Sequence, residues 1–274
     1  MRAFAATLCW GCLAALVAVF AALLSIPSLD QSLRGSWAIF FLAFCLGSYI
    51  AAVHGEHELP DKDLPDSITW SFRRLVMLRL AVIWTLGYFG ASILGRSRGA
   101  LAVFLPIDGW IKFSPVWTPI YLIAFPMILL SLLLVNRRRD LEELASAYTI
   151  TILISAIIFV LHPMEVPRPH LMTEMSFSGW ALQTLYRFDS TRNALPSLHA
   201  GLGLCCCRLS FRISNSIGIL FCVLLLGFLT ATLATRQHAI LDLLTGLTLG
   251  SVALVMAGRI MDRKFPRAAV CPDS

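Results

Sequence analysis

The sequence predicts an all-α integral membrane protein with about eight transmembrane helices. Of its 274 residues, 58% are hydrophobic and 14% are charged, whereas ordinary soluble domains carry about 25% charged residues. The apolar residues gather in runs, and a helix needs about 20 such residues to cross a bilayer. Seven of the eight cysteines lie inside these runs, which is not the pattern of a disulfide-bonded secreted domain.

Eight apolar runs are candidate membrane helices. The first two are 4–26 and 37–53, and the first of these is too long for a cleavable signal peptide and lacks a small-x-small cleavage site. The other six are 75–95, 116–135, 143–162, 196–211, 216–235 and 238–258. The run 75–95 contains Arg79, and the run 196–211 is short with His199 near its start. These two are therefore the least typical membrane helices of the set.

The distribution of Lys and Arg predicts the orientation, because positively charged loops stay in the cytoplasm. With eight helices both termini share a side, and that side receives 13 Lys and Arg against eight on the other. We therefore expect both termini in the cytoplasm. The loop 163–195 and the polar ends of the last helices then face the periplasm, the cell exterior or an organelle lumen.

The segment Pro196-Ser197-Leu198-His199 stands where a polar stretch turns into an apolar run. Proline is favoured in the first turn of a helix, and the backbone N–H groups that follow are an anion site. We expect the amides of Ser197, Leu198 and His199 to be free for that role. Ser197 adds a hydroxyl, and His199 lies close enough to protonate an oxygen that leaves a bound phosphorus.

The second segment is Arg236-Gln237-His238-Ala239-Ile240-Leu241-Asp242. His238 and Asp242 are four positions apart, so they lie on one face of a helix. The carboxylate can fix one imidazole nitrogen and leave the other free to act as a nucleophile. Arg236 at the helix mouth can hold two phosphate oxygens, and so can Arg168, which is framed by two prolines in the loop before the first segment.

These segments resemble the motifs of the type 2 phosphatidic-acid phosphatase superfamily over roughly residues 116–258. Its motifs are an Arg-Pro, matched by Arg168, then Pro-Ser-Gly-His, and then a Ser-Arg followed six residues later by His and Asp. The resemblance is strongest to the branch related to inositolphosphotransferases. It implies catalytic roles for His238 as nucleophile, His199 as acid and Asp242 as orienting carboxylate. It implies phosphate binding by Arg168, Arg236 and Ser197.

The same resemblance implies the domain organisation. Residues 1–70 would hold two N-terminal transmembrane helices and a cytoplasmic loop. Residues 71–274 would form a six-helix catalytic core of the phosphatase type, with the motif loop 163–195. The chain departs from the family pattern at three positions: Leu161 replaces a lysine, Leu198 replaces the motif glycine, and Thr232 stands where the third motif has its arginine.

The function expected from these residues is a metal-independent, membrane-embedded hydrolase that removes phosphate from a lipid phosphate or diphosphate through a phosphohistidine. No cofactor, metal or nucleic acid is expected, and the partners are the lipid phosphate and the surrounding membrane lipids. The first alternative is a lipid phosphotransferase that moves a phosphoryl or phospho-head group to an alcohol. The second is a transporter or flippase, which would place charges near the bilayer midplane and show inverted repeats.

Overall fold

The computed structural model describes residues 68–169 and 176–266 of the chain. The predicted helices at 4–26 and 37–53 lie outside these residues. A boundary between Arg74 and Leu75 separates two units of the chain. The unit that begins at Leu75 contains all the predicted site residues, and the fold below is that of its described part.

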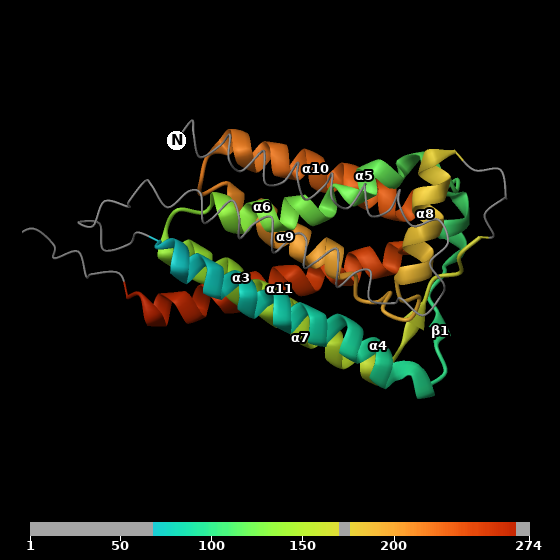
Figure 1. Ribbon diagram of the computed structural model, residues 1–274, viewed down its shortest axis with the longest axis horizontal. Helices are drawn as coiled ribbons and strands as arrows, with labels where there is room; N and C mark the ends of the chain where they lie inside the picture. The colour runs from blue at the N-terminus through green and yellow to red at the C-terminus, as the bar shows by residue number, and fades with distance from the viewer. Residues whose placement is uncertain (1–67, 170–175, 267–274) are drawn as a thin grey trace, which may run out of the picture. The chain divides into compact units, whose positions relative to one another are not determined.

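The described residues are almost entirely helical, and five helical segments are long and apolar enough to cross a membrane. They are Trp70–Ser97, Pro115–Leu134, Arg138–Leu161, Asn215–Ala234 and Ile240–Lys264. The first joins α3 (Trp70–Thr85), the π-helical η1 (Leu86–Gly90), α4 (Ala91–Leu94) and η2 (Gly95–Ser97). The second joins η4 (Pro115–Trp117), α5 (Thr118–Leu122) and α6 (Ala124–Leu134). The last three are α7 (Arg138–Leu161), α10 (Asn215–Ala234) and α11 (Ile240–Lys264), and Figure 1 shows the segments running along one common direction.

The helix predicted at 196–211 is not one of these membrane-crossing candidates. It is α9 (Leu198–Ser210), which has 13 residues and is about 20 Å long at 1.5 Å per residue. That is shorter than the roughly 30 Å hydrocarbon core of a bilayer. The helix packs against α6, α7, α10 and α11, and most of its residues are buried. The expectation of eight spanning helices is therefore not confirmed: five segments of the described residues meet the length and composition of a spanning helix, and α9 is a short helix enclosed by its neighbours.

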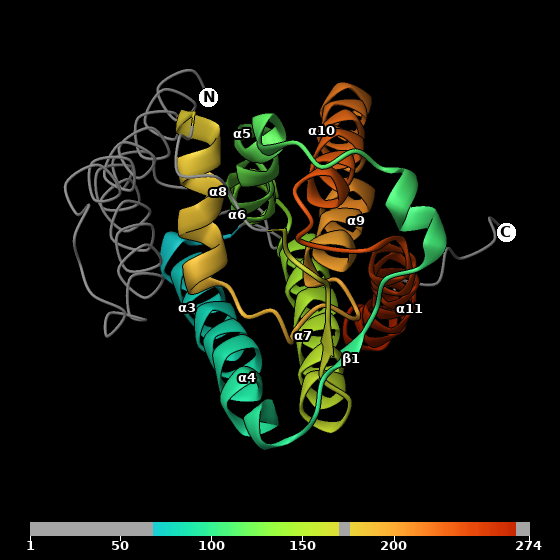
Figure 2. The ribbon, with the colours of Figure 1, turned by 90° about the vertical axis from the view of Figure 1, so that its right-hand side faces the viewer.

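One end of the bundle is closed by the motif loop and the segments that pair with it. The loop contains α8 (Phe177–Phe188), which lies across the end of the other helices (Figure 2). The strand β1 (Leu101–Ala102) pairs in parallel with β2 (Met164–Glu165), and η3 (Pro106–Trp110) follows β1. No helix was predicted in this loop, so α8 is an addition to the expected fold. Its sequence signal is a Ser176 N-cap followed by inward-facing Ala181, Leu182 and Leu185.

The opposite end of the bundle carries a network of ion pairs. Arg212, in the turn after α9, donates to Asp140 at 2.6 Å and to both oxygens of Glu143 at 2.7 and 2.8 Å. The hydrogen bonding of Arg212 to the Glu143 carboxylate is the main reason that the pKa of Arg212 is raised. These partners explain why α7 starts at Arg138, five residues before the predicted start. The acidic residues of its first turns are paired and so can enter the bundle.

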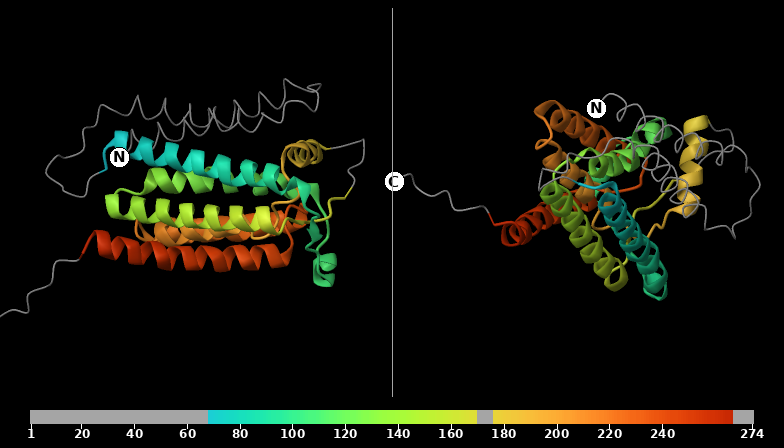
Figure 3. Two further views of the ribbon diagram at one scale, coloured as in Figure 1. Left: turned by 90° about the horizontal axis from the view of Figure 1, so that it is seen from below. Right: turned by 60° about the vertical axis from the view of Figure 1, so that its left-hand side comes forward.

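Helices α9 and α11 approach each other so closely that only glycine fits at three points of contact. A Cβ on Gly246 would stand 2.3 Å from the Ser197 carbonyl oxygen, and one on Gly250 would stand 2.6 Å from the Gly201 carbonyl oxygen. Small residues spaced four apart allow this kind of close helix packing in membrane proteins. Figure 3 shows α7, α9 and α11 as neighbours, and both α7 and α9 pack against α11.

We expect Gly250→Ala to lower the thermal unfolding midpoint of the purified protein. The added methyl group must push apart two backbones, and overpacking of this kind costs about 1–3 kcal/mol. The matched control is Gly90→Ala, because a Cβ at Gly90 meets nothing within 4 Å. Equal midpoints for the two variants, measured in the same detergent, would show that the α9–α11 crossing is not as tight as described.

Candidate active site

The first motif begins α9 and is tied directly to the second motif. The Ser197 side chain is the N-cap of α9 and accepts a hydrogen bond from the Ala200 amide at 3.3 Å. The Ser197 amide donates to the Asp242 carbonyl at 3.0 Å. The expectation of a free Ser197 amide is therefore wrong, and its hydroxyl is buried in a capping role. Its predicted contact with phosphate stays a prediction.

Two histidines and a carboxylate form a continuous chain of contacts between α9 and α11. His199 Nδ1 lies 3.4 Å from His238 Nε2, and His238 Nδ1 lies 3.4 Å from Asp242 Oδ2. Both distances are at the outer limit of a hydrogen bond. The Asp242 carboxylate is fully buried and also accepts from the Ala239 amide at 2.9 Å. Because a carboxylate only accepts, the proton between these two residues lies on His238 Nδ1.

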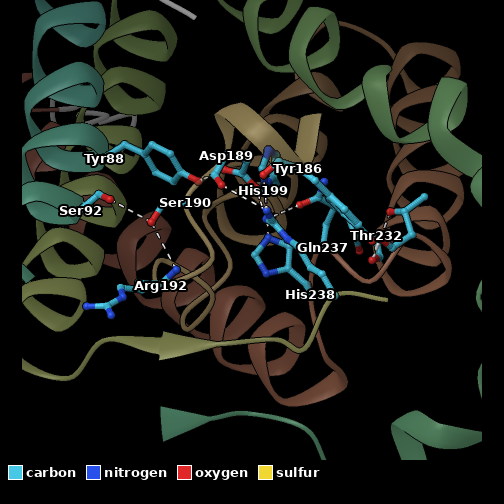
Figure 4. A network of polar contacts seen from close by, with 12 residues as sticks. Tyr88, Ser92, Tyr186, Asp189, Ser190, Arg192, His199, Thr232, Gln237 and His238 are labelled. Carbon is cyan, nitrogen blue, oxygen red and sulfur yellow. Dashed lines mark hydrogen bonds and ion pairs between the residues drawn. The ribbon is translucent and has the colours of Figure 1, made fainter. Parts of the chain in front are cut away.

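His199 is held in place by aromatic rings from three other helices. The ring centroids of Tyr121, Phe125 and Phe228 lie 5.5, 5.4 and 6.2 Å from the centroid of the imidazole. These rings come from α5, α6 and α10, and they leave the His238 side of the imidazole open. Figure 4 shows His199 and His238 close together beneath the motif loop. The pair is therefore fixed by the packing of the bundle rather than by a mobile surface loop.

In the turn after α10 the neighbouring side chains of Arg236 and Gln237 point in different directions. Arg236 has a φ of 51°, and its amide donates to the Leu233 carbonyl, while the Gln237 amide donates to the Thr232 carbonyl. This pair of bonds is a Schellman motif, which ends a helix with a residue in the left-handed region. The turn reverses the chain directly before His238, and it places Gln237 against the site.

The structure does not bring Arg236 to the histidine pair. Its guanidinium donates to the carbonyl oxygens of Asp108 and Ile111, both at 2.8 Å, and lies 4.8 Å from the centre of the Phe104 ring. These partners belong to η3 and its flanks. The third-motif position Thr232 is fully buried and closes the turn. Neither residue lines the cavity beside the histidines.

Arg168 lies within the site region, and its guanidinium is occupied by four acceptors. One nitrogen donates to the Tyr186 and Asp189 carbonyls at 3.1 and 3.2 Å. The other donates to the Asp189 carboxylate at 2.8 Å and to the Gln237 Oε1 at 3.0 Å. The guanidinium also lies 4.6 Å from the centre of the Tyr186 ring. Arg168 is thus connected through Gln237 to the residue next to His238.

Tyr88 and Asp189 both line the cavity, although no motif in the sequence marks them. The Tyr88 hydroxyl donates to the Asp189 carboxylate, and Tyr88 lies in η1, a π-helical turn of the kind often found at functional sites. Asp189 does not pair with Arg192, the nearby cation of the same loop, but with Arg168. Arg192 instead donates to the Arg96 and Arg98 carbonyls. No sequence signal marks Tyr88, because it is one aromatic residue within an apolar run.

Burial also affects Tyr186 of α8, which lies outside the membrane-crossing segments. Burial raises the pKa of its hydroxyl, and the nearby Arg168 acts in the opposite direction. The hydroxyl therefore stays protonated and donates to the Thr235 carbonyl at 2.5 Å. This bond joins α8 to the turn that positions Gln237 and His238.

A small cavity lies beside the histidine pair, with room at its centre for about one water molecule. It is lined by residues from the loop, α9, η1 and the turn before α11, namely Tyr88, Asp189, Ser190, Asn193, Ala194, Leu198, His199, Gln237 and His238. Within residues 68–169 and 176–266, no group of three or more His, Cys, Asp or Glu is placed to hold a metal ion. The site chemistry available in this region is that of paired imidazoles, a buried carboxylate and a guanidinium.

A family model described as the PAP2 superfamily matches residues 97–256, a range that contains Arg168, His199, His238 and Asp242. No curated protein and no solved structure matches the chain. The family match covers more than half of the chain and confirms the resemblance seen in the motifs. The chain belongs to the PAP2 superfamily, the type 2 phosphatidic-acid phosphatases.

Proposed function

We propose that the protein is a membrane-embedded hydrolase that removes phosphate from a lipid phosphate or diphosphate through a phosphohistidine on His238. Family membership indicates a phosphatase-type enzyme that acts on phosphorylated substrates. The observation that carries the finer proposal is the chain of contacts from Asp242 through His238 to His199. It supplies a carboxylate, an oriented nucleophile and a second imidazole in that order.

In the first step His238 Nε2 attacks phosphorus, because Nδ1 carries the proton that Asp242 accepts. The bond between phosphorus and the lipid oxygen breaks, and His199 gives a proton to that oxygen. In the second step His199 takes a proton from the acceptor, whose oxygen attacks phosphorus and breaks the nitrogen–phosphorus bond. Since the two ring nitrogens are 3.4 Å apart, the imidazoles must separate to admit a phosphoryl group between them.

Arg168 is the phosphate-binding residue that the geometry supports best. Arg168 donates to Gln237 and Asp189, which both line the cavity, and a guanidinium can bind two phosphate oxygens at once. We propose that the phosphate takes over acceptor positions now filled by the Asp189 carboxylate. Asp189 keeps a second partner, the Tyr88 hydroxyl, when it gives up Arg168.

A lipid substrate fits a site at one end of a bundle whose outer surface is apolar. Exposed Leu, Ile and Val side chains cover the membrane-crossing helices. A cluster of cations lies at the other end of the helices and consists of Arg139, Arg212 and Lys264. By the positive-inside rule we propose that this cluster and both termini are cytoplasmic and that the site faces the opposite side.

A lipid phosphotransferase is the second candidate, and one observation favours it. Leu198, at the position of the motif glycine, is buried and lines the cavity. An apolar side chain there makes the cavity drier, which favours an alcohol over water as acceptor. The transporter alternative has less support, because the histidines lie at the starts of α9 and α11 rather than near the middle of the bundle.

The test is phosphate release by detergent-purified protein, in chelator, from a panel of lipid phosphates and diphosphates. We expect release by the wild type and a loss of about 10³-fold or more in His238→Ala and in His199→Ala. Both variants should keep the thermal unfolding midpoint near that of the wild type. Retained turnover in either folded variant would contradict the mechanism, and no release by folded wild type would direct the assay to alcohol acceptors.

Substitution of Arg168 and substitution of Arg236 should have different effects on catalysis and stability. Arg168→Gln should lower kcat/KM about 10- to 100-fold through a higher KM, since it removes charge-assisted bonds to phosphate. Arg236→Gln should change kcat/KM less than about threefold and instead lower stability, because its guanidinium ties η3 to the turn before His238.

The control for Arg168 is the double variant Arg168→Gln with Asp189→Asn, which removes the carboxylate left unpaired by the single change. Its stability should recover while its KM stays high. Recovery of KM together with stability would assign Arg168 a purely structural role, and a higher KM in Arg236→Gln would restore that residue to the phosphate-binding set.

A further inference from the structure

Two buried amide atoms beside the histidine pair have no hydrogen-bond partner in the protein. They are the Asn193 Oδ1 and the Gln237 Nε2. Asn193 is 4% exposed and Gln237 is 5% exposed, and both line the cavity with His199 and His238. Buried polar atoms without a partner are rare and costly, so each marks a place where a ligand or water completes the bonding.

In each side-chain amide the other polar atom makes a hydrogen bond within the protein. That bond determines whether the oxygen or the nitrogen of the amide is without a partner. Asn193 Nδ2 donates to the Tyr88 carbonyl at 2.9 Å, so its oxygen is the unused atom. Gln237 Oε1 accepts from Arg168 at 3.0 Å, so its nitrogen is the unused atom. The cavity therefore offers one acceptor and one donor from two different segments of the chain.

We propose that Asn193, Gln237 and His199 form the binding site for the water that attacks the phosphohistidine. This inference rests on the proposed function and deepens it, since it assigns the acceptor. Water has two hydrogens and two lone pairs. One hydrogen bonds Asn193 Oδ1, the other bonds His199, one lone pair accepts from Gln237 Nε2, and the remaining lone pair attacks phosphorus.

Other ligands use this set of groups less well. An unprotonated phosphate oxygen only accepts, so it would face Asn193 Oδ1 acceptor to acceptor. An alcohol has a single hydroxyl hydrogen, which must point to His199 when it attacks, and Asn193 Oδ1 is then left unpaired. The amide pair thus favours hydrolysis over transfer, in opposition to the drying effect of Leu198.

In the second step the water oxygen forms its bond to phosphorus while the bond from phosphorus to His238 Nε2 breaks. The electron pair of that bond returns to Nε2, and the proton facing His199 moves to the imidazole. The products are inorganic phosphate and the free histidine pair. The proton on His199 is the one that it gives to the leaving lipid oxygen in the next turnover.

The experiment measures how one phosphoenzyme divides between two acceptors. Full-length protein is incubated with short-chain phosphatidic acid labelled in its phosphate, with and without methanol, and inorganic phosphate and methyl phosphate are counted. The variants are Asn193→Leu and Gln237→Leu. The matched control is Gln183→Leu, a half-buried amide of α8 that does not line the cavity.

We expect the ratio of hydrolysis to transfer to fall about tenfold or more in Asn193→Leu, because water loses a bond that methanol, with its single hydroxyl hydrogen, does not use. Gln237→Leu should slow decay of the phosphoenzyme with both acceptors, so that acid-labile phosphate accumulates on the protein. Gln183→Leu should match the wild type. The ratio compares products of the same phosphoenzyme, so it reports correctly even when a variant folds in reduced yield.

An unchanged ratio in Asn193→Leu, or parallel slowing of phosphoenzyme formation and decay in Gln237→Leu, would overturn the water site while leaving the phosphohistidine mechanism in place. A wild type that transfers phosphate to methanol but releases none in its absence would also overturn it. A wild type that releases phosphate without any phosphoenzyme would overturn the proposed function, and the water site with it.

Discussion

A single backbone hydrogen bond, from the Ser197 amide to the Asp242 carbonyl, joins the two histidine motifs. It forms only because α9 and α11 cross at glycines, where the Ser197 carbonyl occupies the space that a Gly246 side chain would need. The crossing places the first turn of α9, which contains His199, next to the residues directly before α11, which include His238. Side chains 39 positions apart in the chain therefore meet with their ring nitrogens 3.4 Å apart.

The charged side chains of the bundle lie in two groups, one at the site end and one at the opposite end. At the site end the buried groups are arranged as a chain, in which Tyr88 contacts Asp189, Asp189 contacts Arg168, and Arg168 reaches Gln237 beside the cavity. At the far end the charges pair with one another across α7, α11 and the turn after α9. Partly exposed ion pairs of this kind each contribute little net stability. We infer that the far cluster fixes the helix ends, which leaves the site end free to exchange partners.

Much of the core could be predicted from local patterns. The six apolar runs from 75–95 to 238–258 each coincide with a described helix, because helical periodicity is a local property. His238 does contact Asp242, but it lies two residues before α11, so the expectation that the two share one face of a helix was wrong. The remaining features depend on distant partners. Nothing within α9 shows that its neighbours enclose it, and nothing near Arg236 shows that its guanidinium binds the carbonyls of Asp108 and Ile111. Tyr88 and Asp189 meet across 101 positions, which no motif spacing can reveal.

The central claim is that Asp242 orients His238 so that Nε2 is the nucleophile. Phosphorus NMR of the denatured phosphoenzyme, formed with a labelled lipid phosphate and trapped in alkali, tells phosphate on Nε2 from phosphate on Nδ1. The account predicts one phosphohistidine, substituted at Nε2 and mapped to the His238 peptide. Phosphate on Nδ1, or on His199, would contradict it, because the Nδ1 of His238 faces the buried carboxylate and His199 is assigned to proton transfer.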